Sequence, residues 1–131
     1  MILRNTELEL AVLDQDKPYI GNERRLCIRM EHDNILFIDD LAFENDVTKS
    51  IAIRCVIMWA IHEMKINDEF REKVLSLKFG EREKGSLKPM RTFVLGYRVG
   101  KALDECREEY RIYNVSAFIN YSILYFKNHY E

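Results

Sequence analysis

The stretch "RLCIRMEHDNILFIDDLAFENDVTKSIAIRCVI", residues 25–57, decides the fold because its hydrophobic period changes along its length. At its start, Arg25, Cys27 and Arg29 alternate with apolar residues, which is typical of a strand with one buried face. Apolar residues then recur at steps of three and four, which predicts a helix. Thr48, a residue type that caps helix N-termini, precedes a second and almost wholly apolar run. The sequence therefore predicts strand, helix, helix.

The same order recurs in "MRTFVLGYRVGKALDECREEYRIYNVSAFINYSI", residues 90–123. Phe93 and Leu95 are candidates for a buried strand face, and Asn114 is a second helix cap. The second helices of the two copies align when Thr48 is matched with Asn114, an offset of 66 residues. The strands and first helices align better at an offset of 65, so the second copy has one residue inserted in the turn between its helices. Because a lone strand leaves its backbone groups unpaired, we expect the two strands to pair antiparallel and to bring the apolar helices into one core.

The rest of the chain divides into an N-terminal extension, residues 1–22, and a connector, residues 65–89. The extension precedes a first unit, residues 23–64, and the connector joins this unit to a second unit, residues 90–131. Asn67 is expected to cap a short helix in the connector, followed by an exposed turn rich in glycine. In the extension, "LELAVLD" is a candidate strand.

Composition indicates a soluble globular chain of about one domain. Of 131 residues, 47% are hydrophobic and 32% are charged, and no stretch approaches the roughly 20 apolar residues of a membrane span. The start, "MILRNTELEL", lacks the pattern of a secretory signal, and three cysteines without CxxC spacing suggest free thiols in a reducing compartment. We therefore expect a cytoplasmic protein without membrane contact.

Catalytic and cofactor signals are weak. His32, His62 and His129 are scattered, and only His32 has an adjacent aspartate. None of the five glycines falls in a phosphate-loop spacing, and the cysteines and histidines do not have metal-ligand spacing. We expect neither an enzyme nor a bound cofactor or metal.

The first stretch, from the alternating "RLCIRM" through "LAFEND" to "TKS", resembles the ribbon-helix-helix family, which includes the Arc and MetJ repressors and many plasmid regulators and antitoxins. The stretch "TFVL…LDECREEYRIYNVSAFINYSI" resembles it less closely. In that family two units form a two-stranded ribbon that enters the major groove of DNA. Over residues 23–64 and 90–131, the resemblance implies an α+β, mainly helical fold. It would be an intramolecular pseudo-dimer of two ribbon-helix-helix units with one antiparallel ribbon.

In the first strand, the resemblance assigns base readout to Arg25, Cys27 and Arg29. Arginine suits this role because its fork can donate two hydrogen bonds to the O6 and N7 atoms of guanine. An ordinary surface strand also has a polar outer face, so the pattern alone does not distinguish readout from simple solvation.

In the second strand, the equivalent positions are Met90, Thr92 and Val94. Thr92 could contact a base or a thymine methyl, whereas Val94 offers no hydrogen bond. A shifted register would make Arg91 the reading residue instead. Because the second strand departs from the first, any recognised site is expected to be asymmetric.

The helix openings are assigned to DNA phosphates by the same resemblance. Free amides and the helix dipole at an N-terminus attract anions without many lysines. Thr48, Lys49 and Ser50 would act in the first copy, and Asn114 and Ser116 in the second. Plain helix capping explains the same residue types.

The expected function is therefore sequence-specific binding of double-stranded DNA, as a transcriptional regulator or a DNA-processing accessory factor. A net charge of −2 requires that any DNA contact come from a local patch. The alternative is a protein-interaction module with the same fold, such as an antitoxin or a phage-type inhibitor. Another protein or a second copy of the chain is an alternative partner.

Overall fold

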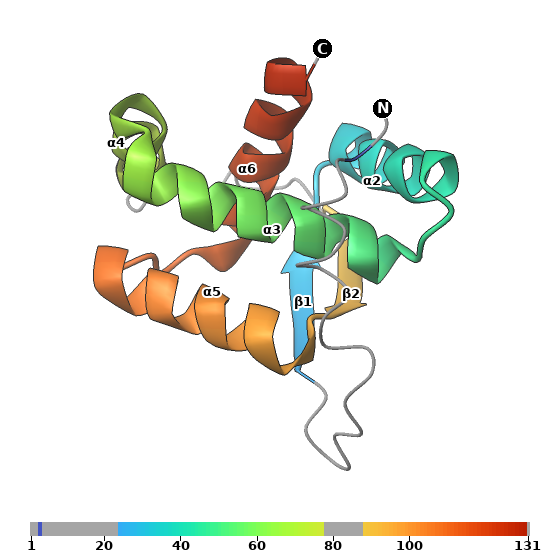
Figure 1. Cartoon of the computed structure of the whole chain (residues 1–131), viewed down its shortest axis with the longest axis horizontal. Helices are drawn as coiled ribbons and strands as arrows, with labels where there is room; N and C mark the ends of the chain where they lie inside the picture. The colour runs from blue at the N-terminus through green and yellow to red at the C-terminus, as the bar shows by residue number, and fades with distance from the viewer. Residues whose placement is uncertain (1–2, 4–23, 78–87, 131) are drawn as a thin grey trace.

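The computed structural model describes residue 3 and residues 24–77 and 88–130 (Figure 1). Their elements are, in order, β1 (Arg25–Arg29), α2 (His32–Glu44), α3 (Lys49–Ile66), α4 (Asp68–Ser76), β2 (Met90–Val94), α5 (Gly96–Tyr110) and α6 (Val115–Tyr130). The predicted α+β class, mainly helical with a small antiparallel sheet of two strands, is confirmed. The candidate strand "LELAVLD" and most of the glycine-rich turn lie outside the described residues.

The two strands form one antiparallel ribbon, in which Leu26 pairs with Phe93 and Cys27 with Thr92. β1 alternates between exposed and buried residues, as its sequence predicts, and Leu26 and Ile28 are buried. Antiparallel partners point to the same face of a sheet, so Phe93 joins them in the core. A two-stranded ribbon is marginal alone, and here its inner face packs on helices.

The helices bury the faces that their sequences indicate. α3 is buried on almost every side, as an apolar helix between several neighbours must be. It contacts α2, α4, α5, α6 and β2. The buried residues of α2, α5 and α6 recur at helical spacing: Asn34, Ile35, Ile38, Leu41 and Ala42; Val99, Gly100, Leu103 and Cys106; Phe118, Ile119, Ser122, Ile123 and Phe126.

Both second helices begin with the predicted caps. The Thr48 Oγ1 atom accepts the N–H of Ile51 at 3.1 Å. The Asn114 Oδ1 atom accepts the N–H of Ala117 at 3.0 Å. Each cap satisfies an amide that lacks a partner in the helix, and such a cap contributes about 1 kcal/mol.

The turns before these caps share an unusual backbone. Asp46 and Arg111 have φ of 53° and 54°, the left-handed region that L-residues rarely adopt. In each turn the next residue donates its N–H to the carbonyl five residues before it. The distances are 3.0 Å from Val47 and 2.9 Å from Ile112. The second turn reaches its cap one residue later than the first does, so Tyr113 is the inserted residue.

α4 closes one end of the core with aromatic contacts. The ring of Phe70, which is fully buried, lies 5.6 Å from Tyr121, 5.0 Å from Tyr125 and 6.0 Å from Trp59, measured between centroids. Asn67 caps this helix by accepting the N–H of Phe70 at 3.0 Å, as predicted. Among the described helices, none is long and apolar enough to cross a membrane.

Candidate nucleic-acid interface

The outer face of the ribbon consists of three cross-strand pairs. It lies on the side away from the buried residues Leu26, Ile28 and Phe93. Its members are exposed except for Val94, which is half-buried. The pairs are Arg25 with Val94, Cys27 with Thr92, and Arg29 with Met90. One strand therefore contributes both arginines, and the other contributes two apolar side chains and a threonine.

Arg91 does not share this face. It pairs with Ile28, whose side chain is buried, so strand alternation turns Arg91 toward the helices. The register predicted for Met90, Thr92 and Val94 is therefore the one observed, and the shifted register with Arg91 in their place is not. Arg91 is nevertheless exposed, and it lines a surface hollow.

Two serines hold the ends of the strands. The Ser50 Oγ atom in α3 accepts the N–H of Val94 at 3.0 Å. The Ser116 Oγ atom in α6 accepts the N–H of Arg29 at 3.3 Å. Each serine thus binds the strand of the other strand–helix–helix segment, and its hydroxyl oxygen accepts one hydrogen bond within the protein. Its contact with a DNA phosphate stays a prediction.

A second pair of side chains binds the carbonyls of the same strand residues. Arg54, which is 5% exposed, donates from Nε to the Val94 carbonyl at 2.8 Å. Asn120 donates from Nδ2 to the Arg29 carbonyl at 2.8 Å. Arg54 and Asn120 occupy equivalent positions in the two second helices, one turn after the two serines. Sequence reasoning missed both, although an arginine inside the apolar run "SIAIRCVI" is a signal, since a buried charge needs a partner.

A hollow of about 260 Å³ opens at the N-terminus of α3, between α2 and β2. Thr48, Lys49 and Ser50 line it together with Arg91, so three predicted phosphate residues and one predicted base-reading residue meet there. Asp39 also lines it and forms an ion pair with Lys49 at 3.2 Å. The helix N-terminus and two cations favour an anion at this place, and Asp39 partly balances them.

The equivalent place at the N-terminus of α6 has different side chains. When the two segments are aligned, Val115 stands for Lys49 and Leu26 for Arg91. Arg24 lies across Gly100 there and forms an ion pair with Asp104. A Cβ atom at position 100 would lie 2.7 Å from the Arg24 Cγ atom, so the glycine allows this close approach.

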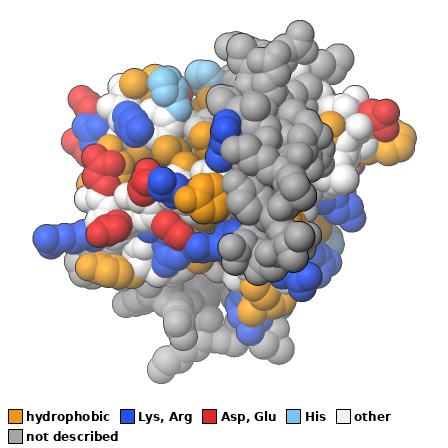
Figure 2. Space-filling view, turned by 60° about the horizontal axis from the view of Figure 1, so that its bottom comes forward, with side chains coloured by type: hydrophobic (Ala, Val, Ile, Leu, Met, Phe, Trp, Pro, Cys, Tyr) orange, Lys and Arg blue, Asp and Glu red, His pale blue; other side chains and the backbone are white. Residues whose placement is uncertain are grey.

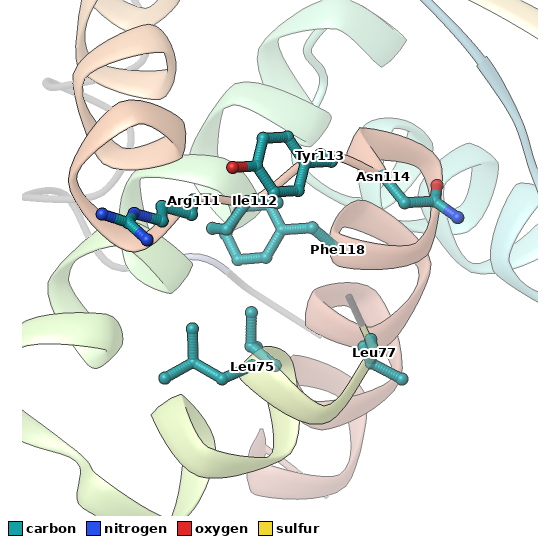
Figure 3. A pocket seen from close by; sticks show the side chains of 8 residues that line it. Leu75, Leu77, Arg111, Ile112, Tyr113, Asn114 and Phe118 are labelled. Atoms are coloured by element: carbon teal, nitrogen blue, oxygen red, sulfur yellow. The ribbon is translucent and has the colours of Figure 1, made fainter. Parts of the chain in front are cut away.

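A smaller hollow lies between the end of α4 and the turn that joins α5 to α6 (Figure 3). Apolar side chains such as Leu75, Leu77 and Phe118 form much of its wall. It encloses about 10 Å³, close to the space that one water molecule needs. It is therefore a packing gap rather than a ligand site.

The charged surface is mixed. Figure 2 shows acidic and basic side chains interspersed over the described part of the visible face. Within the described residues no group of three possible metal ligands occurs. Cys27 is exposed on the ribbon, whereas Cys55 and Cys106 are buried. Burial, and then the nearby charge of Glu109, raises the pKa of the Cys106 thiol to about 11, so the thiol stays protonated at neutral pH.

Comparisons of the chain with models of known protein families, with curated proteins and with solved structures found no match. Any function assigned to the chain therefore rests on its own residues and geometry.

Proposed function

We propose that this protein is an intramolecular pseudo-dimer of two ribbon-helix-helix units. In this proposal it binds double-stranded DNA sequence-specifically, without catalysis, as a transcriptional regulator or DNA-processing accessory factor. The observation that carries the proposal is the paired ribbon, whose outer face exposes Arg25 and Arg29 while its inner face packs on the helices. A two-stranded ribbon fits the major groove, where each base pair has a distinct pattern of donors and acceptors.

The repeated contacts support the pseudo-dimer. In α3, a serine and an arginine bind the last residue of β2. In α6, a serine and an asparagine at the equivalent positions bind the last residue of β1. The hydrogen bonds that flank the ribbon recur as well, from the N–H of Met30 to the carbonyl of Pro89 and from the N–H of Leu95 to the carbonyl of Arg24. A two-fold relation between the segments accounts for all of these pairs.

The two arginines give the outer face a direct chemical use. Arg29 follows Arg25 by four steps along one strand, a span of about 13 Å at the usual strand rise. That span is close to the rise of four base pairs, at about 3.4 Å each. The two guanidinium groups can therefore reach different base pairs of one site, while Met90 and Val94 suit contact with thymine methyl groups.

The hollow at α3 supports a phosphate contact beside the ribbon. Lys49 and Arg91 line it, and it opens at the N-terminus of α3, where the first backbone amides have no acceptor within the helix. A phosphate bound there would compete with Asp39 for Lys49. This local concentration of positive charge explains how a chain of net charge −2 could bind DNA.

Binding-site selection from random duplexes, at two salt concentrations, tests the proposal. We expect a defined motif, and for Arg29→Ala a loss of about 1–3 kcal/mol in specific affinity, which is roughly 5- to 150-fold. Lys73→Ala is the matched control, because it removes an exposed positive charge from α4 and not from the ribbon. Equal affinities of the two variants would remove Arg29 from the interface.

The salt dependence separates DNA binding from the alternative function, a protein-interaction module with the same fold. Each phosphate contact releases counterions and adds about 0.9 to the slope of log K against log salt. A steep slope with a defined motif is the expected result. A flat slope, or weak binding to every sequence, would contradict DNA binding and favour the protein-interaction module.

A further inference from the structure

α2 exposes two large apolar side chains on one side. Leu36 is 48% exposed and Phe43 is 89% exposed, and they are two helical turns apart. Asp40 lies between them at helical spacing and is also exposed. α2 lies at one edge of the molecule (Figure 1). Single exposed apolar residues are common, but an almost fully exposed phenylalanine above a leucine on one helix face is not explained by packing.

The second segment shows that the fold does not require these side chains. At the equivalent positions, α5 has Lys101 in place of Leu36 and Glu108 in place of Phe43. Both are exposed. The two helices also differ in charge: α2 contains four acidic residues and no lysine or arginine, whereas α5 contains four acidic and three basic residues. The apolar, acidic character thus belongs to α2 and not to α5.

We propose that the outer face of α2 (His32, Leu36, Asp40 and Phe43) docks a basic, amphipathic segment of another protein. Apolar side chains of that segment pack on Leu36 and Phe43. Its lysines and arginines lie near Asp40 and Asp33, which is also exposed. Amphipathic segments commonly bind proteins through apolar anchors at helical spacing, and complementary charge supplies orientation and selects against acidic partners.

Charge argues against the other occupants. Residues 4–23 follow Leu3, whose N–H bonds the Asn45 side chain at the end of α2 at 2.8 Å, but they contain five acidic and two basic residues. A second copy docked symmetrically through this face would bring two acidic helices together. DNA is itself an anion and is repelled by it.

The test uses a fluorescent synthetic peptide of leucine and lysine with a helical repeat, titrated into the full chain. A peptide with glutamate in place of lysine is the charge control. We expect the lysine peptide to bind at low salt and the glutamate peptide not to bind. Leu36→Ser with Phe43→Ser should weaken binding tenfold or more, and Asp40→Lys should weaken it as well.

The matched control changes the equivalent α5 positions, Lys101→Ser with Glu108→Ser, and should leave peptide affinity unchanged. All substituted side chains are exposed, so melting temperatures should stay close to the parent value. Absence of binding, binding of both peptides alike, or equal loss in the α2 and α5 variants would overturn the proposal. Self-association that disappears with Phe43→Ser in sedimentation would overturn it in favour of a second copy.

Discussion

The N-terminus of α3 and the N-terminus of α6 lie at equivalent positions beside the ribbon but present different chemistry to solvent. Both begin with a capping side chain, and both bind a strand through a serine two residues later. Around α3, however, stand Lys49 and Arg91, with a hollow between them. At α6 the same places hold Val115 and Leu26, and Arg24 lies against Gly100 and forms an ion pair with Asp104.

The comparison shows that the fold requires the repeated hydrogen bonds, whereas the surface charges beside them can vary. The repeated hydrogen bonds satisfy strand and helix groups that would otherwise lose their partners, which costs about 1–3 kcal/mol for each buried group. Both segments therefore keep them. Surface charge carries no such penalty, so the two helix openings can differ. In the proposed function, DNA would be held more strongly beside α3 than beside α6.

The largest effect is expected where the shared contacts are removed. Asn120 donates to the Arg29 carbonyl and accepts the N–H of Glu31 and a bond from Asn34. Asn120→Ala removes these three hydrogen bonds, each worth about 1 kcal/mol, and should lower the free energy of unfolding by about 3 kcal/mol. Urea denaturation measures it. Asn128→Ala, at an exposed position of the same helix, should change it by less than about 0.5 kcal/mol, and an equal loss would contradict the anchoring role.

The next effect converts the α3 opening into the α6 opening. Lys49→Val combined with Arg91→Leu should weaken DNA binding by about 10- to 100-fold and reduce the salt slope by about two phosphate contacts, or roughly 1.8. Both residues are exposed, so stability should change little. Fluorescence anisotropy over a salt series measures both quantities. An unchanged slope would show that this hollow does not hold phosphates.

Removal of the caps should affect both segments alike. Thr48→Ala and Asn114→Ala each leave one helix amide without its side-chain partner, and each should cost about 1 kcal/mol of stability. Thermal denaturation of the two variants provides the comparison. A loss at only one helix would mean that the two openings are not equivalent in the fold.

The smallest expected effect is a gain. Val115→Lys gives the α6 opening the charge that α3 has, and should raise DNA affinity a few-fold and the salt slope by about 0.9. The same anisotropy series measures it. Asn128→Lys, near the other end of α6, is the control for net charge; an equal gain there would indicate general attraction rather than a phosphate contact.

Local elements were predictable because they depend on local periods. The alternation in β1, the helical spacing in α2 and the caps of both second helices are all confirmed. The register of the ribbon could not be decided from the sequence alone. A strand in this stretch could place either residues 90, 92 and 94 or residue 91 on its outer face. Pairing of Leu26 with Phe93 decides it, because a shift by one residue would move Phe93 out of the core.

The candidate interface was only partly accessible. Sequence alone singled out Ser50 and Ser116 as related, but it did not indicate that their hydroxyls bind opposite strands. Those contacts join residues far apart in the sequence, and no local period encodes them. Arg91 likewise lies near the start of α3 only in the folded chain, and no local sequence pattern indicates this.

Both ribbon strands belong to a single polypeptide, which affects how the strands can mutate and how the unfolding midpoint responds to dilution. In an assembly of two identical chains, one codon change alters both strands; here it alters one and leaves the other intact. The two strands can therefore diverge independently. Ribbon formation is also unimolecular, so the unfolding midpoint should not fall as the sample is diluted, unlike that of an obligate homodimer.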